Sequence, residues 1–212
     1  RISMFFGSRR KMKSVVAAEA AAVAAWRVLS QRDRVGAIVY DDTDMRVIPP
    51  HRSEARVAQI LKCVVEKNQA LNAKSNIEPG TDMLNRALKR VSSVARHDCL
   101  VCLIGDGTGI DDMTRHYVTR LTEHNDVLSL FVYDPLEQAM PEAGRLVFSD
   151  GLSEVEFNTA EKKLREAYSA DFQRRLERMK KTSRRHAIPL LPVHTAAPVL
   201  EQVRDILGTH RR

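Results

Sequence analysis

The stretch that decides the fold is residues 98–112, which read DCLVCLIGDGTGIDD. The run from Cys99 to Ile104 is apolar, is too short for a helix and is ended by Gly105-Asp106-Gly107. Such a run is typical of a strand buried on both faces, and strands of that kind belong to parallel sheets. Ligands of parallel sheets lie beyond the carboxyl ends of the strands, so Asp106 is placed where a polar site would be built.

The rest of the chain alternates between helical and strand patterns. Apolar residues at helical spacing predict helices over 11–30, 53–65, 81–91, 112–121, 160–181 and 198–207. Apolar runs predict strands over 35–40, 45–48, 127–133 and 188–193, with a short hairpin over 145–157. This alternation predicts an α/β fold, an open, doubly wound, mostly parallel sheet with helices on both faces. We expect residues 1–212 to form a single domain.

The formal net charge of +7 raises the question of an acidic partner. Much of the excess lies on one predicted helix, between Arg174 and Arg185. No aromatic residue is interleaved there for base stacking, so a solvated helix face is the simpler interpretation. Binding of an acidic protein surface or of a phosphate backbone through residues 174–185 stays open as an alternative.

Three cysteines, an odd number, do not form a disulfide framework and suit a reducing cytoplasm. Cys99 and Cys102 are three residues apart in a predicted strand, so their side chains point to opposite faces and neither a disulfide nor a shared metal is expected. No apolar run reaches the roughly 18 residues that cross a bilayer. We therefore expect a soluble, cytoplasmic domain. Because the sequence begins with Arg1, we expect it to be part of a longer polypeptide, and an upstream membrane anchor stays open.

Four polar residues are expected at the carboxyl edge of the sheet: Ser3, Thr81, Asp106 and Asp134. Two hydroxyls and a carboxylate from separate loops would suit a hard cation such as Mg²⁺, which prefers oxygen ligands. The alternative is capping, with Thr81 as the N-cap of a helix and Asp106 holding a turn.

An ordered set of motifs runs through nearly the whole chain. It consists of Ser3-Met4-Phe5-Phe6-Gly7-Ser8, Asp33-Arg34-Val35-Gly36, Pro50-His51-Arg52-Ser53, Pro79-Gly80-Thr81-Asp82, the strand that ends in Asp106, Asp134-Pro135-Leu136-Glu137 and Thr195-Ala196-Ala197-Pro198. This set resembles domain-of-unknown-function family fifty-eight. The resemblance implies a bacterial protein with a von Willebrand factor type A-like fold, encoded beside a MoxR-type AAA ATPase.

The type A fold usually holds its metal with Asp-x-Ser-x-Ser after the first strand, a threonine from a second loop and an aspartate after a later strand. Thr81 and Asp106 match the last two, and Ser3 matches the final serine. Arg1 stands where the preceding serine belongs, and the aspartate and the central first strand would precede Arg1. The resemblance thus implies an N-terminally incomplete domain with a degenerate metal site that holds Mg²⁺ or no cofactor. We hypothesise that the Arg1 guanidinium replaces the cation and pairs with Asp106. The alternative is that Arg1 points into solvent.

For function, the sequence favours a non-enzymatic protein-binding module, because it lacks a P-loop, a nucleophile elbow and a zinc-protease helix. The resemblance implies partnership with the MoxR-type ATPase in a chaperone-like maturation of other protein complexes. We expect no small-molecule substrate, and nucleic-acid binding is kept as an alternative only. The expected partner-binding residues lie at the carboxyl edge: Arg1, Ser3, Thr81, Asp106, Thr108, Asp111 and Asp134.

The rival hypothesis is a Mg²⁺-dependent phosphohydrolase. Residues 105–112 are similar to the metal-binding Gly-Asp-Gly loop of the haloacid dehalogenase superfamily. Those enzymes also need an Asp-x-Asp-x-Thr nucleophile loop, and the nearest candidate, residues 42–46, has Arg46 in place of the threonine. Nucleic-acid binding through the basic helix is the third hypothesis.

Overall fold

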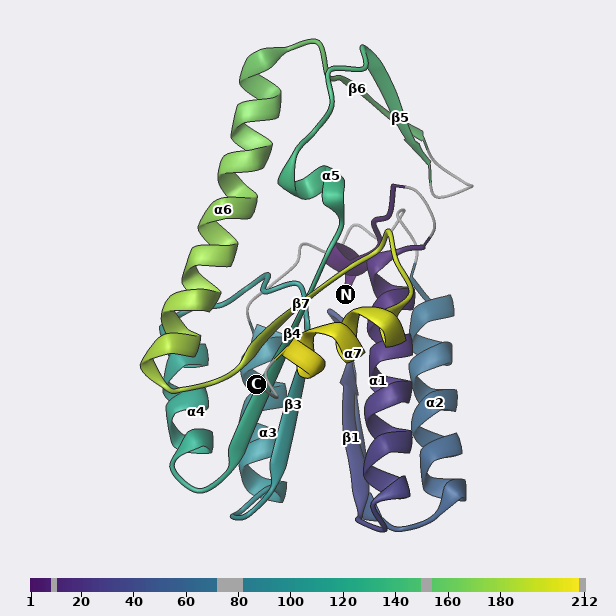
Figure 1. Cartoon of the computed structure of the whole chain (residues 1–212), viewed down its shortest axis with the longest axis vertical. Coiled ribbons are helices and arrows are strands. Elements are labelled where there is room, and N and C mark those ends of the chain that lie inside the picture. The colour runs from purple at the N-terminus through teal and green to yellow at the C-terminus, as the bar shows by residue number, and fades with distance from the viewer. Residues whose placement is uncertain (9–10, 72–81, 150–153, 210–212) are drawn as a thin grey trace.

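The computed structural model describes residues 1–8, 11–71, 82–149 and 154–209 (Figure 1). Its helices, besides the short 3-10 turn η1 (Ile2–Met4), are α1 (Lys13–Ser30), α2 (Glu54–Gln69), α3 (Asp82–Val94), α4 (Asp112–Thr122), α5 (Pro135–Gln138), α6 (Lys162–Arg185) and α7 (Val199–Thr209). Its strands are β1 (Val35–Tyr40), β2 (Met45–His51), β3 (Leu100–Gly105), β4 (Asp126–Tyr133), β5 (Arg145–Ser149), β6 (Glu154–Asn158) and β7 (Leu190–His194).

The centre of the fold is a three-stranded parallel sheet in the order β3-β4-β7. β1 and β2 form a separate antiparallel pair, and β5 and β6 form another. β7 lies at the edge of the sheet, as Pro189 and Pro192 predict.

Helices cover both faces of this sheet. α1 and α7 pack on the face that carries Leu130 and Val132 of β4. On the opposite face, α3 and α4 pack against β3 and β4, and α6 packs on Phe131 of β4. Cys102 faces the first group and Cys99 the second, so their side chains point apart as predicted. The doubly wound α/β class is therefore confirmed, and it fits a type A-like fold.

The antiparallel pair departs from its predicted length. We expect the second strand to end at Ile48, before Pro49 and Pro50, but β2 continues to His51. β2 is an edge strand, and its pairing with β1 is irregular between Val35 and Ala37, so the two prolines fall where the regular ladder is interrupted. Gly36 permits this pairing, because a Cβ atom there would lie 2.7 Å from the nitrogen of Pro50.

The prediction that β3 is buried on both faces is wrong. Val101 is buried, but Leu100 is 63% exposed and the remaining residues of β3 are half-buried. The reason is that, among the described residues, β3 pairs with β4 on one edge and has no strand on the other, where the sheet is interrupted between β3 and β1 (Figure 1).

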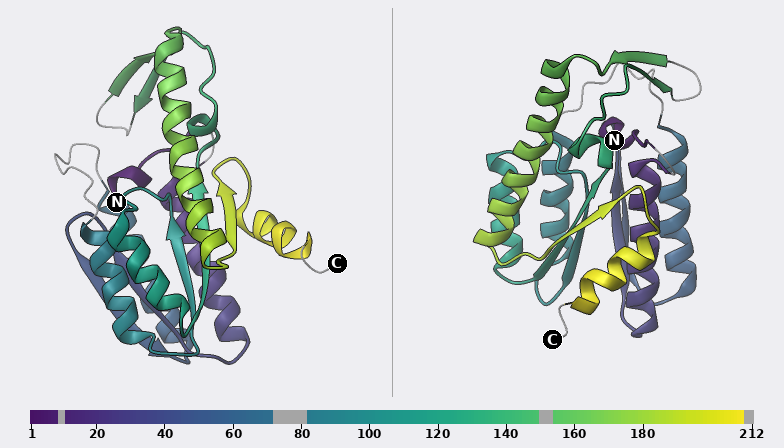
Figure 2. Two further views of the ribbon diagram at one scale, coloured as in Figure 1. Left: turned by 90° about the vertical axis from the view of Figure 1, so that its left-hand side faces the viewer. Right: turned by 45° about the horizontal axis from the view of Figure 1, so that its top comes forward.

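Beyond the carboxyl ends of the strands, α5 and the β5–β6 hairpin lie with the first half of α6 as a projection from the body (Figure 2). α6 has 24 residues and buries Phe172 and Met179. Within the described ranges, no helix combines the length and the apolar character that a membrane span requires.

Candidate functional site

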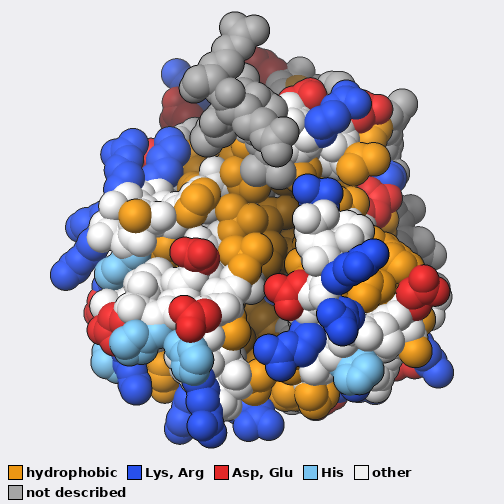
Figure 3. Space-filling view, turned by 60° about the horizontal axis from the view of Figure 1, so that its bottom comes forward, with side chains coloured by type: hydrophobic (Ala, Val, Ile, Leu, Met, Phe, Trp, Pro, Cys, Tyr) orange, Lys and Arg blue, Asp and Glu red, His pale blue; other side chains and the backbone are white. Residues whose placement is uncertain are grey.

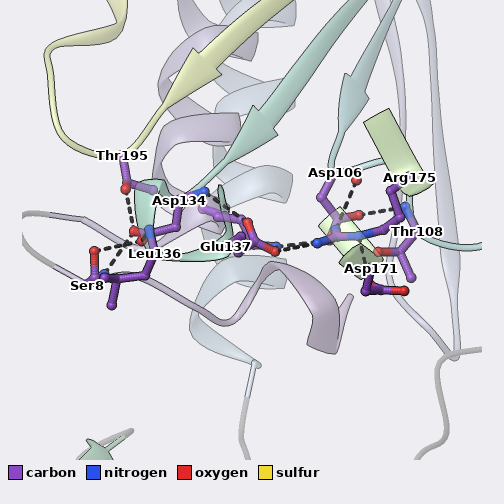
Figure 4. A network of polar contacts seen from close by, with 10 residues as sticks. Ser8, Asp106, Thr108, Asp134, Leu136, Glu137, Asp171, Arg175 and Thr195 are labelled. Carbon is purple, nitrogen blue, oxygen red and sulfur yellow. Dashed lines mark hydrogen bonds and ion pairs between the residues drawn. The ribbon is translucent and has the colours of Figure 1, made fainter. Parts of the chain in front are cut away.

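A buried ion pair joins the end of β3 to the start of α1. Asp106, directly after β3, is 3% exposed, and Lys13, the first residue of α1, is 2% exposed. The Lys13 ammonium donates to the Asp106 carboxylate over 3.1 Å and to the Glu137 carboxylate of α5 over 2.9 Å. One ammonium group therefore bridges two buried carboxylates from separate segments of the carboxyl edge (Figure 4).

Arg175 of α6 supplies a second cation. Its guanidinium donates to the Glu137 carboxylate over 2.9 Å and to the backbone carbonyl of Asp106 over 3.4 Å. Its Nε, which makes no hydrogen bond to any described residue, lies 3.3 Å from the carboxylate of Asp171. We call Lys13, Arg175, Asp106 and Glu137 the ion cluster. It holds α1, α5, α6 and the end of β3 together with two positive and two negative charges.

The charges of the ion cluster stabilise one another. Burial alone raises the pKa of Asp106, but the nearby charge of Lys13, the N–H of Thr108 and the charge of Arg175 outweigh it and hold that pKa below its usual value. Burial likewise lowers the pKa of Arg175, and the carboxylates of Glu137 and Asp106 more than offset this, so its pKa is raised. At neutral pH Asp106 is therefore a carboxylate and Arg175 a cation.

Asp134, directly after β4, connects the ion cluster to two further loops. This fully buried residue is the N-cap of α5, and its backbone N–H donates to Glu137 over 2.9 Å. Its carboxylate accepts hydrogen bonds from the backbone N–H and hydroxyl of Ser8, at 2.9 and 2.6 Å, from the N–H of Leu136 at 2.9 Å, and from the Thr195 hydroxyl (Figure 4). Burial raises the pKa of Asp134, but these hydrogen bonds outweigh it, so the pKa is lowered.

The predicted pair between Arg1 and Asp106 is wrong. The Nε of Arg1 donates to Asp42 over 2.9 Å, and another guanidinium nitrogen donates to the backbone carbonyl of Thr108 over 2.9 Å. The alternative of a solvent-directed Arg1 is wrong too, because its side chain is 7% exposed. Arg1 therefore ties the turn after β1 to the loop after β3, and the cation that faces Asp106 is Lys13.

Four of the predicted rim residues, Arg1, Asp106, Thr108 and Asp134, lie at one edge of the sheet. Thr108 donates its N–H to Asp106 over 3.1 Å and accepts from Arg1, so these residues and Asp134 belong to one polar network. Asp111 instead caps α4 and accepts two hydrogen bonds from the amide of Asn85 on α3, at 3.1 and 3.0 Å.

The predicted partner-binding set needs correction. Asp106 and Asp134 are buried, and the side chain of Arg1 is nearly so, so they hold the rim together and do not lie on its surface. Ser3 is half-buried in η1. Thr81 lies outside the described residues.

The resemblance implies a Mg²⁺ site formed by Ser3, Thr81 and Asp106, and the structure allows a test of the fit. The buried hydroxyl of Ser3 has no hydrogen-bond partner among the described residues, which would suit an added ligand. Asp106, however, already accepts from Lys13 at 3.1 Å, so a metal ion would have to displace a buried ammonium. In the described ranges, no group of three His, Cys, Asp or Glu side chains could hold a metal. With Asp106 already paired to Lys13, the described residues of this set do not fit Mg²⁺.

Sequence reasoning missed three members of the ion cluster: Lys13, Glu137 and Arg175. Helical spacing offers a signal for two of them. Lys13 lies three residues before buried Val16 on α1, and Arg175 lies three residues after buried Phe172 on α6. Each charge therefore falls on the buried stripe of its helix. The Asp-x-x-Glu spacing of Asp134 and Glu137 is a capping-box pattern that would have found the third.

Residues 1–178 match the model of a family described as protein of unknown function DUF58. A search of curated proteins found no match.

Two solved structures are similar to a limited degree. The conserved hypothetical protein BatB from Bacteroides thetaiotaomicron is 13% identical, with 92% of this chain and 89% of that chain covered and a TM-score of 0.45. An uncharacterized membrane spanning protein from Vibrio fischeri is 14% identical, with 92% of this chain and 85% of that chain covered and a TM-score of 0.26. Neither TM-score is high enough to bear on the fold or the function. The family match, which covers most of the chain, shows what the ordered motifs predicted: the chain belongs to the DUF58 family of proteins of unknown function.

Proposed function

We propose that this chain is a non-enzymatic protein-binding module that docks through the carboxyl edge of its sheet. Its partner would be a MoxR-type AAA ATPase, in a chaperone-like maturation of other protein complexes. A partner that depends on ATP would place the chain in the cytoplasm. The reducing conditions there keep thiols free, which suits its three free cysteines.

One observation carries the proposal: an ammonium group, Lys13, occupies the position beside Asp106 where a metal-dependent binding site would hold its cation. The carboxylate is neutralised and buried, so it is available neither as a metal ligand nor as a catalytic base. The ion cluster therefore makes the carboxyl edge a rigid support for the loops that lie on it. Rigid frames with exposed loops are the common design of binding surfaces.

The accessible part of this edge is the loop after β3 and the first turn of α4. Gly107 and Gly109 have φ angles of +71° and +85°, and a side chain at Gly107 would collide with Met179 of α6, so the loop path is specific. Thr108 and Asp111 are half-buried in it. Asp112 is exposed, and beside it Met113 is 50% exposed. An exposed methionine suits a partner with an apolar contact, whereas the carboxylate of Asp112 faces Arg115 of the same helix.

Capture of a purified MoxR-type ATPase by the full-length protein, with and without ATP, tests the proposal. We expect Met113→Gln to weaken capture by about tenfold or more, a loss of about 1.4 kcal/mol. Val65→Thr is the matched control, because Val65 is 47% exposed but lies on α2, across the molecule from α4 (Figure 1). Equal effects of the two variants, or no capture by the unaltered protein, would refute the assignment.

The contacts of Asp106 and Asp42 do not favour the phosphohydrolase alternative. It needs one carboxylate free to attack phosphorus and another free to bind Mg²⁺. Asp106 accepts from Lys13, and Asp42 accepts from Arg1 and from the backbone N–H of Ile2 over 2.7 Å. Hydrolysis of p-nitrophenyl phosphate with Mg²⁺ that is lost in Asp42→Asn would reinstate this alternative.

The ion pairs along α6 do not favour nucleic-acid binding through this helix either. Several of its cations already face carboxylates of the same chain: Arg174 faces Asp171 at 3.2 Å, Lys180 faces Glu177 at 2.9 Å, and Arg175 belongs to the ion cluster. A steep loss of affinity for DNA or RNA with added salt would argue for it.

A further inference from the structure

A positively charged cavity lies at the foot of the molecule, where α1 and β2 end and β1 begins, at the opposite end from the carboxyl edge (Figure 1). The cavity has a volume of about 430 Å³ and is lined by Arg32, Asp33, Arg34, His51 and Arg52. Figure 3, turned so that this end comes forward, shows Lys and Arg side chains gathered beside a hydrophobic hollow. We propose that the cavity binds a phosphate group. This proposal goes beyond the docking role of the carboxyl edge.

Two of the motifs that predict the family meet at this cavity. One contains Arg34, directly before β1, and the other contains Arg52, directly after β2. Val35 is the antiparallel partner of His51, so the two motifs lie side by side. Arg34 and Arg52 are the next residues beyond this pair on the two strands. The pairing of β1 with β2 therefore brings guanidinium groups from separate parts of the chain to one place.

The cavity carries an excess of positive charge. Among the described residues, no carboxylate forms an ion pair with Arg32, Arg34 or Arg52. Asp33 also lines the cavity, and its carboxylate accepts the backbone N–H of Arg34 over 2.6 Å. Three guanidinium groups against one carboxylate leave two positive charges in excess. Like charges held close together repel one another, and a phosphate dianion would neutralise this excess.

The backbone at Arg32 adopts an uncommon conformation. Its φ angle is +60°, in the left-handed region that glycine adopts most easily. The N–H of Arg32 donates to the carbonyl of Leu29 over 2.8 Å, and the N–H of Asp33 donates to the carbonyl of Val28 over 3.3 Å. This is the pattern of a Schellman motif, in which glycine is the usual residue. An arginine here costs backbone free energy, and such costs are typical of residues that serve a binding site.

The cavity offers the hydrogen-bond donors that a phosphate group requires. A guanidinium can donate two parallel N–H groups to two phosphate oxygens. Arg52 is held in place by its own donation to the backbone carbonyl of Arg32 over 3.1 Å. The Nδ1 of His51 lies 3.1 Å from the hydroxyl of Ser53, which accepts the N–H of Arg56 over 3.2 Å. When that hydroxyl donates to Nδ1, the Nε2 of His51 carries the proton and becomes a further donor.

The lining also limits the kind of ligand. Apart from His51, no residue that lines the cavity has an aromatic ring, so the cavity lacks a surface on which a nucleic-acid base would stack. Its chemistry selects the phosphate group itself. That group can belong to a soluble phosphate compound or to the headgroup of a lipid.

Calorimetric titration of the protein with sodium pyrophosphate tests the proposal. At about 0.15 M salt, attraction to the net charge alone is largely screened. We expect saturable binding that Arg34→Gln weakens about tenfold or more, because a charged hydrogen-bond donor is lost. The Arg34 side chain makes no hydrogen bond or ion pair with a described residue, so this variant should unfold at the same urea concentration as the unaltered protein.

Arg174→Gln is the matched control. It removes the same charge from α6, where the side chain is 62% exposed and faces Asp171, and it should leave the affinity for pyrophosphate unchanged. No saturable binding of pyrophosphate would overturn the proposal. Equal effects of Arg34→Gln and Arg174→Gln would overturn it too, because the attraction would then come from the net charge.

Vesicles of phosphatidylcholine with and without phosphatidic acid distinguish the two sources of the phosphate group. Arg34-dependent binding to vesicles with phosphatidic acid, displaced by pyrophosphate, would support the cavity as a site for a lipid headgroup. Arg34-dependent binding of pyrophosphate without binding to either kind of vesicle would support a soluble phosphate compound. Vesicle binding that Arg34→Gln leaves unchanged, with no binding of pyrophosphate, would refute the phosphate site.

Discussion

The ammonium nitrogen of Lys13 lies 3.1 Å from the carboxylate of Asp106, and these side chains are 2% and 4% exposed. A buried pair of this kind adds little net stability over apolar residues of similar size, because removing both charges from water is costly. The pair instead fixes the relative positions of the elements that carry it. Lys13 can satisfy Asp106 and Glu137 together only if α1, the end of β3 and α5 keep their relative positions.

Replacing Lys13 by methionine keeps a long, unbranched side chain but removes its positive charge. Asp106 and Glu137 would then share Arg175 alone, and we expect the free energy of unfolding in urea to fall by about 3–5 kcal/mol. Lys11→Met is the matched control: the pair of Lys11 with Glu19 is 37% and 36% exposed, so its loss should cost about 0–1 kcal/mol. Adding Asp106→Asn to Lys13→Met should recover part of the loss. A Lys13 variant no less stable than the Lys11 variant would contradict the prediction.

Arg175 and Arg174 are neighbours on α6 with different surroundings. The Arg175 side chain is 17% exposed and paired with Glu137, whereas that of Arg174 is 62% exposed. We expect Arg175→Met to cost about 1.5–3 kcal/mol, because it removes hydrogen bonds to a buried carboxylate. Arg174→Met should stay within about 0.5 kcal/mol of the unaltered protein. Chemical denaturation measures both, and equal losses would show that Arg175 is an ordinary surface residue.

Acid should destabilise the protein through Asp106 and Asp134. Their pKa values are lowered in the folded state, so below the unfolded value of about 3.9 the unfolded chain binds more protons. The stability that they contribute is complete above that value and is lost as pH falls toward their folded pKa values. Each group should add about 1.4 kcal/mol per pH unit to the slope there. Urea unfolding at a series of pH values from 7 to 3 measures the slope of the unfolding free energy against pH. Asp134→Asn should reduce this slope by the contribution of one titrating group. An unchanged slope would contradict this.

The Thr195 hydroxyl is one of the donors that hold the buried Asp134 carboxylate. We expect Thr195→Val, which keeps the side-chain shape, to reduce the free energy of unfolding by about 1.5–3 kcal/mol. Thr182→Val is the control, since that hydroxyl bonds within the exposed turn of α6 to the carbonyl of Arg178. Its cost should lie within about 0.5 kcal/mol. If the two variants are equally stable, Asp134 does not depend on Thr195.

Most of the fold could be predicted from the sequence, because apolar spacing reports which face of an element is buried. The run from Cys99 to Ile104 predicts β3, and the opposite placement of Cys99 and Cys102 follows from strand geometry. The burial of β3 could not be predicted, because it depends on the neighbour of its second edge.

The site was predicted less well than the fold. Motif order placed Asp106, Thr108 and Asp134 at the correct edge, but motifs carry no information on side-chain partners. The cation beside Asp106 is Lys13 of α1, which is distant in the sequence from the loop after β3. A lysine on an otherwise apolar stripe indicates a buried partner, yet only the tertiary structure tells which carboxylate it meets.

The central claim is that Lys13 takes the place of a divalent ion at Asp106, and a Mg²⁺ titration of thermal stability tests it most directly. We expect the Tm to be the same in EDTA and in millimolar Mg²⁺, because the carboxylate already has its cation. A saturable rise of the Tm with Mg²⁺ that disappears in Asp106→Ala would contradict the claim.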